Sequence, residues 1–133
     1  MKKIEERKDI ANLVAHFYAK IRRDEFLGPI FNKHIKEEQW PLHLEKIADF
    51  WESNLFGVIK FKGNPIEKHI AVDKQSKHSI EMTHFAKWLQ LWLESIDELF
   101  EGQIAEKAKH NARKMATGQY LAIWQHRKEE GII

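Results

Sequence analysis

The stretch "WPLHLEKIADFWESNLFG" (residues 40–57) contains the start, the buried face and the end of one helix. Trp40-Pro41 suits a first helical turn, where the N–H group that proline lacks has no partner within the helix. Apolar residues then recur at helical spacing, at Leu44, Ile47, Phe50, Trp51 and Leu55. Gly57 is the residue type that ends helices in a left-handed conformation. The pattern predicts an amphipathic helix with aromatic residues on its inner face.

An upstream helix shows the same periodicity. Its apolar face consists of Ile10, Leu13, Val14, Phe17, Tyr18 and Ile21. Asp9 is the expected N-cap. The helix should end before "FLGPIF" (residues 26–31), because Gly28-Pro29 cannot continue it.

Downstream, Asn64-Pro65 predicts the start of a short helix around His69. A long helix is expected from near Ser79 or Thr83 to Gly102, followed by a last helix over about 103–128. No segment alternates with period 2, so strands are not expected. We predict an all-α fold with four substantial helices and shorter ones.

Composition limits the classes of function. With 133 residues, the chain is expected to form a single domain over residues 1–133. The absence of Cys excludes disulfides, thiolate metal sites and thiol nucleophiles. The net charge is +2 and Lys alternates with Glu, which argues against nucleic-acid binding. No apolar run is long enough for a membrane span, and "MKKIEERKDI" is too acidic to lead into a secretion signal. We expect a cytoplasmic protein, complete as written.

Common catalytic motifs do not occur. The chain has no HExxH motif, no glycine-rich phosphate loop and no sign of a Ser-His-Asp or paired-carboxylate site. His78 and His84 are six residues apart, which does not match the helical ligand spacings of three and four. Six of the eight histidines are interpreted as surface or partly packed residues: His16, His34, His78, His84, His110 and His126.

Two histidines differ from the others because they fall on apolar faces. His43 precedes Ile47 by one turn, and His69 lies between Ile66 and Ile70. Each, taken alone, is more often a satisfied core or boundary histidine than a ligand.

Tyr18 and Trp88 also lie on apolar faces and carry one polar hydrogen each. Several polar groups aimed into one aromatic interior would cost stability unless something there bonded to them. A large, flat, metal-bearing ligand would satisfy all of them together.

Four separated motifs resemble the group III truncated haemoglobins, a family of bacterial globin-like haem proteins. The motifs are "FYAKIRRDEFLGPIF" (17–31), "WPLHLEKIADFW" (40–51), "PIEKHIAV" (65–72) and "HFAKWLQLW" (84–92). The similarity runs over roughly residues 8–125. The absence of Gly-Gly pairs after the early helices agrees with group III. The resemblance implies a shortened globin fold, a two-over-two helical sandwich around haem b.

The resemblance also implies roles for individual residues. His69 corresponds to the proximal ligand of the haem iron. Tyr18 and Trp88 correspond to distal residues that face a bound gas. His43 corresponds to the residue at the distal gate position, where it could donate to the gas or gate its entry. Residues in or beside the haem pocket would be Phe31, Ile47, Phe50, Trp51, Ile66, Ile70, Phe85 and Trp92. Each of the wall residues could instead belong to the ordinary helix–helix core. Lys33, Lys46 and Lys68 could reach haem propionates, although lysines of this kind are most often simply surface residues.

This interpretation predicts reversible binding of dioxygen, nitric oxide or carbon monoxide at a five-coordinate iron. A polar pocket retains oxygen, which suits sensing, storage or chemistry better than delivery. The alternative is an enzyme, a nitric oxide dioxygenase or peroxidase-like protein. A dioxygenase would need a separate reductase, because this chain has no flavin or nicotinamide domain. A haem-free helical interaction module is a third possibility.

Overall fold

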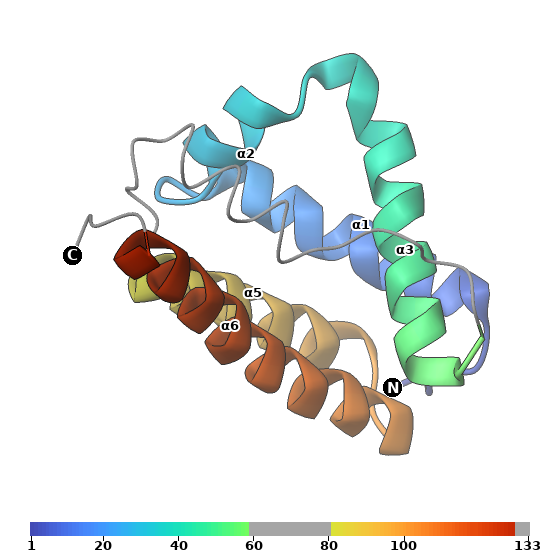
Figure 1. The fold of residues 1–133 in the computed structure, drawn as a ribbon. Coiled ribbons are helices and arrows are strands. Elements are labelled where there is room, and N and C mark those ends of the chain that lie inside the picture. The colour runs from blue at the N-terminus through green and yellow to red at the C-terminus, as the bar shows by residue number, and fades with distance from the viewer. Residues whose placement is uncertain (59–80, 130–133) are drawn as a thin grey trace.

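The computed structural model describes residues 1–58 and 81–129, which form six helical segments (Figure 1). These segments are α1 (Arg7–Arg23), α2 (Gly28–His34), η1 (Glu37–Gln39), α3 (Trp40–Phe56), α5 (Met82–Leu99) and α6 (Gln103–Glu129). Within these ranges the extended pairing consists of an isolated bridge between Lys2 and Phe100. The predicted all-α fold is therefore confirmed. The short helix expected around His69 lies outside the described residues.

The helices form two layers. In Figure 1, α1 and α3 make one layer, and the antiparallel pair α5 and α6 makes the other. α1 packs against α3 and α2 within its layer and against α5 across the sandwich, while α3 also touches α6. This is the predicted two-over-two arrangement. None of the helices in the described ranges is long and apolar enough to cross a membrane.

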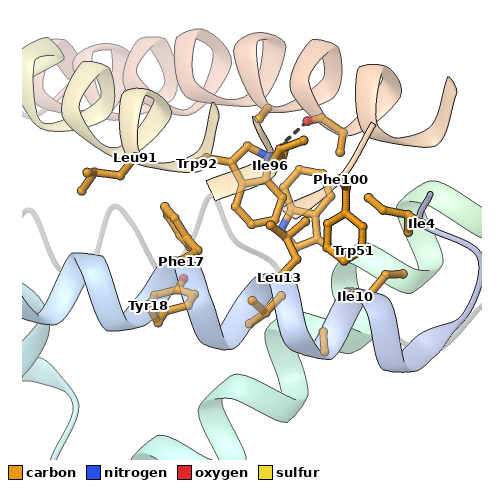
Figure 2. Close-up of a cluster of buried hydrophobic side chains, with 14 of the residues drawn as sticks. Ile4, Ile10, Leu13, Phe17, Tyr18, Trp51, Leu91, Trp92, Ile96 and Phe100 are labelled. Carbon is orange, nitrogen blue, oxygen red and sulfur yellow. Dashed lines mark hydrogen bonds between the residues drawn. The ribbon is translucent and has the colours of Figure 1, made fainter. Parts of the chain in front are cut away.

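The core lies where α1 and α3 face α5, as Figure 2 shows. The indole rings of Trp51 and Trp92 stack with centroids 4.5 Å apart and an interplanar angle of 19°. The Trp92 indole N–H donates to the Ala108 carbonyl on α6, at 3.2 Å. On α6 the residues that face the core are mainly small: Ala105, Ala108, Ala112 and Ala116. Small side chains let α6 approach α5 closely enough for this bond.

The expectation that Asp9 caps α1 is wrong by one turn. α1 begins at Arg7 with Glu6 as its N-cap, and Asp9 occupies the third helical position. The Asp9 carboxylate is only 3% exposed and accepts the backbone N–H groups of Glu5 and Glu6, at 2.9 and 3.2 Å. Lys2 lies 2.9 Å from it. A carboxylate that reaches back in this way stabilises an additional turn ahead of the apolar stripe.

The break after α1 occurs where the sequence predicts it, but for a different reason. α1 ends at Arg23, and the Asp24 carboxylate accepts the N–H groups of Phe26 and Leu27, at 3.0 and 2.9 Å. Gly28-Pro29 then opens α2. A Cβ atom on Gly28 would lie 2.8 Å from the Arg22 carbonyl oxygen, so this position accommodates only glycine.

The remaining boundaries follow the sequence closely. Trp40-Pro41 begins α3, and Gly57, with φ of 73°, caps its end. α6 ends at Glu129, one residue beyond the expected end. α5 ends at Leu99, before Gly102, because the Glu101 N–H pairs with the Lys2 carbonyl of the N-terminal segment.

Candidate functional site

Three of the predicted site residues come together although they belong to three different helices. Tyr18 is on α1, His43 on α3 and Trp88 on α5. The Tyr18 and His43 rings meet edge to face, with centroids 5.5 Å apart and planes at 86°. The Trp88 indole hydrogen bonds to the Tyr18 hydroxyl. Tyr18 is therefore the centre of the group.

Burial controls the chemistry of Tyr18. Its side chain is enclosed by the rings of Phe17, Phe31 and Trp40, with centroids at 4.9, 5.9 and 5.7 Å. This burial raises the pKa of the Tyr18 hydroxyl well above its ordinary value, while the hydrogen bond with Trp88 acts in the opposite direction. The hydroxyl therefore keeps its proton at physiological pH and can donate it in a hydrogen bond.

Trp88 borders both the site and the core. Its ring is parallel to that of Trp92, one turn further along α5, with centroids 6.2 Å apart and an interplanar angle of 8°. The Phe17 ring packs edge-on against both indoles, at 5.6 and 5.0 Å. Trp88 remains partly exposed, whereas Trp92 is fully buried. The packing thus holds Trp88 in place without covering it.

Trp40 was not among the predicted site residues, yet it contacts two of them. Its ring meets the Tyr18 ring at 5.7 Å and the His43 ring at 5.4 Å. The Arg22 guanidinium covers the same indole from outside, 4.5 Å from the ring centroid. Trp40 precedes His43 by three residues on one helix, and side chains at this spacing are neighbours. That spacing could have placed Trp40 in the site.

Comparison with known proteins agrees with this geometry. No family model matches the chain. A curated relative, the group 3 truncated hemoglobin ctb of Campylobacter jejuni, is 33% identical over 110 residues, which are 81% of this chain and 83% of the relative. The chain belongs to the group III truncated haemoglobins. The crystal structure of a group III truncated hemoglobin from Campylobacter jejuni matches with a TM-score of 0.83 and 29% identity, over 95% of this chain and 98% of that one.

Membership of this family makes the chain a haem-binding globin, so its residues can be tested for their fit to a haem. Haem is a large, flat and mainly apolar group. In this truncated haemoglobin, Phe31, Ile47 and Phe50 pack on the core but stay half-buried, as does Trp88. Apolar side chains that keep exposed surface beside a buried phenol donor fit such a ligand.

The other expected pocket residues fall into two groups. Trp51 and Trp92 stack on one another in the core, which favours a structural role. Phe85 is 8% exposed and belongs to a second cluster with Ala116 and Ile123.

Four expected residues lie outside the described ranges: Ile66, Lys68, His69 and Ile70. Lys33 and Lys46 are exposed, as surface lysines are.

Proposed function

We propose that this truncated haemoglobin binds haem b through His69 and reversibly binds dioxygen and other diatomic gases on the opposite face of the haem. The observation that carries the proposal is the meeting of Tyr18, His43 and Trp88 beside half-buried apolar side chains. The role of His69 rests on its place in the "PIEKHIAV" motif. When bound, the haem supplies an iron atom with one open position for a gas.

The side chains would determine how firmly a gas is held. Trp88 donates to the Tyr18 oxygen, and accepting that bond leaves the Tyr18 proton available for a ligand. A ligand that carries partial negative charge gains from donors fixed in a water-poor site. Each such bond contributes about 1.5–3 kcal/mol. Because every 1.4 kcal/mol changes a rate or affinity about tenfold, the pocket should release oxygen slowly.

Chemistry on the retained ligand is a second candidate function, supported by the same buried donors. A gas that is held for a long time can react with nitric oxide, and a haem with a polar distal side can turn over peroxide. Catalysis of this kind would need electrons from a separate reductase. If the oxy form reacts with nitric oxide no faster than a globin with an apolar distal pocket does, the dioxygenase alternative fails.

The proposed function is tested by the visible spectra of the ferric, ferrous, oxy and carbonmonoxy forms. We expect the wild type to show a five-coordinate ferrous spectrum and to bind both gases. His69→Ala should lose haem or the spectrum of an imidazole ligand. His110→Ala, which removes an exposed histidine on α6, is the matched control and should resemble the wild type. Wild-type spectra in His69→Ala, or a wild type that stays colourless after haem addition, would contradict the proposal.

A further inference from the structure

A surface hollow of about 660 Å³ lies at the junction of α1, α2, η1 and α3. Its lining includes Arg22, Asn32, Glu37 and Trp40. The Trp40 side chain lines this hollow and also packs against the rings of Tyr18 and His43. One indole ring, itself 3% exposed, therefore stands between the hollow and two of the proposed distal residues.

Arg22 holds this indole from the outer side. Its guanidinium lies 4.5 Å from the Trp40 ring centroid and forms an ion pair with Glu37, three residues before Trp40. Its Nε donates to the Asn32 side-chain oxygen at 3.5 Å, and the Asn32 amide donates to the Arg22 carbonyl at 3.2 Å. One residue of α1 thus connects α2, η1 and α3.

The contacts on the outer side of Trp40 are individually weak. The Glu37 side chain is 80% exposed, and exposed ion pairs contribute little and are screened by salt. The Arg22 side chain is 32% exposed, so its cation–π contact with the buried Trp40 indole is also a modest attraction. Moving Trp40 would break both the Arg22 contact and the ring contacts with Tyr18 and His43.

We propose that Arg22 and Trp40 form a gate through which small uncharged ligands pass between the surface hollow and the distal residues. This inference rests on the proposed function, because it assumes that a gas binds beside Tyr18. Ordinary surface packing of Arg22 would instead leave the rates of ligand binding unchanged.

The test is the rate of carbon monoxide association with the ferrous haem protein after flash photolysis. Arg22→Gln removes the cation and should raise the association rate about two- to fivefold, the scale of the weak contacts that it deletes. Arg22→Lys retains a cation and should fall between Arg22→Gln and the wild type. Arg23→Gln, which removes a neighbouring charge from the same hollow but leaves the Arg22–Trp40 contact intact, is the matched control. We expect the wild-type rate in this control.

Salt provides a second measure. Carbon monoxide carries no charge, so salt cannot affect its approach by electrostatic steering. If the gate operates, the wild-type association rate should rise with ionic strength as the Arg22–Glu37 pair is screened. The same rise should be absent in Arg22→Gln.

A third readout does not depend on ligand rates. In the carbonmonoxy complex, the NMR signal of the Arg22 Nε–H group should be shifted upfield by the Trp40 ring, and Trp40→Leu should abolish that shift. If Trp40→Leu does not fold, the surface variants of Arg22 still decide the question. Normal carbon monoxide binding with equal rates in wild type and Arg22→Gln would contradict the gate alone. Failure of the wild type to take up haem would overturn the proposed function as well.

Discussion

Trp88 and Trp92 lie one turn apart on α5 with parallel rings, but they have different partners. The Trp92 N–H is bonded to the Ala108 backbone carbonyl, and no part of the side chain is exposed. The Trp88 N–H is bonded to the hydroxyl of another side chain, Tyr18, and its ring is partly exposed. A bond to the backbone of a packed helix fixes the ring permanently. The Tyr18 hydroxyl, in contrast, accepts the Trp88 N–H and still has its own proton to donate. That proton is available to bind a ligand.

The largest effect is expected for substitution of Trp92, the tryptophan that is bonded to the backbone and buried in the core. Trp92→Ala should lower the free energy of unfolding by about 3–5 kcal/mol, because it leaves a cavity beside Trp51 and the Ala108 carbonyl loses its bond. Trp92→Phe keeps a ring and should lose less. Urea denaturation measures both. A loss below about 1 kcal/mol in Trp92→Ala would contradict the structural role assigned to this ring.

Tyr18→Phe should affect ligand release far more than it affects folding. Loss of the hydroxyl should raise the dioxygen release rate about ten- to a hundredfold, as expected for a bond of about 1.5–3 kcal/mol. Because burial raises the pKa of this hydroxyl, the wild-type rate should show no titration of Tyr18 between about pH 6 and 9. Stopped-flow measurement gives the rate.

Tyr120→Phe is the control for this prediction, since Tyr120 is the other of the two tyrosines and packs against Phe85 at 5.9 Å. Equal release rates in Tyr18→Phe and Tyr120→Phe would refute a specific role for Tyr18.

Trp88→Phe should have a smaller effect on the same rate, about tenfold. The phenylalanine ring keeps most of the packing against Phe17 but cannot donate to Tyr18. Stability should change by about 1 kcal/mol, far less than for Trp92→Ala. If neither Trp88→Phe nor Tyr18→Phe changes the release rate, hydrogen bonding by these two residues does not retain the ligand.

Asp9, in the first turn of α1, belongs neither to the site around Trp88 nor to the core around Trp92. Its substitution should therefore change only the stability of the fold. Burial raises the pKa of its carboxyl, but the N–H groups of Glu5 and Glu6 and the ammonium of Lys2 outweigh this and lower the pKa below its usual value. The charged form therefore stabilises the fold above the unfolded-state pKa of about 3.9, and this contribution is lost as pH falls through the lower folded-state pKa.

Asp9→Asn should accordingly cost about 1 kcal/mol at pH 7 and progressively less below about pH 4. Urea denaturation at several pH values measures the difference from the wild type. Dioxygen release should be unchanged in this variant. A cost that is independent of pH would show that the charge of Asp9 is not what stabilises α1.

The sequence predicts the helices well because each carries its own period and end signals, as the stretch from Trp40 to Gly57 illustrates. Asp9 is misplaced because a carboxylate three residues inside a helix looks the same in the sequence as an N-cap. Periodicity assigns Tyr18 and Trp88 to inner faces but cannot show that they meet, since that depends on how α1 crosses α5. The roles assigned to them came from the family resemblance. Trp40 was missed because its contacts with Tyr18 and Arg22 come from α1 and depend on how α1 packs against α3, although its spacing from His43 is visible in the sequence.

Gly28 determines how closely α2 can approach α1. Any side chain there would collide with the carbonyl of Arg22 and move the whole segment outward. Two residues of α2 would move with it: Phe31, which packs on the Tyr18 ring, and Asn32, which bonds to Arg22. Because Gly28 has no Cβ atom, α2 can lie close to the end of α1. The packing of Phe31 on Tyr18 and the hydrogen bond between Asn32 and Arg22 both depend on this short distance.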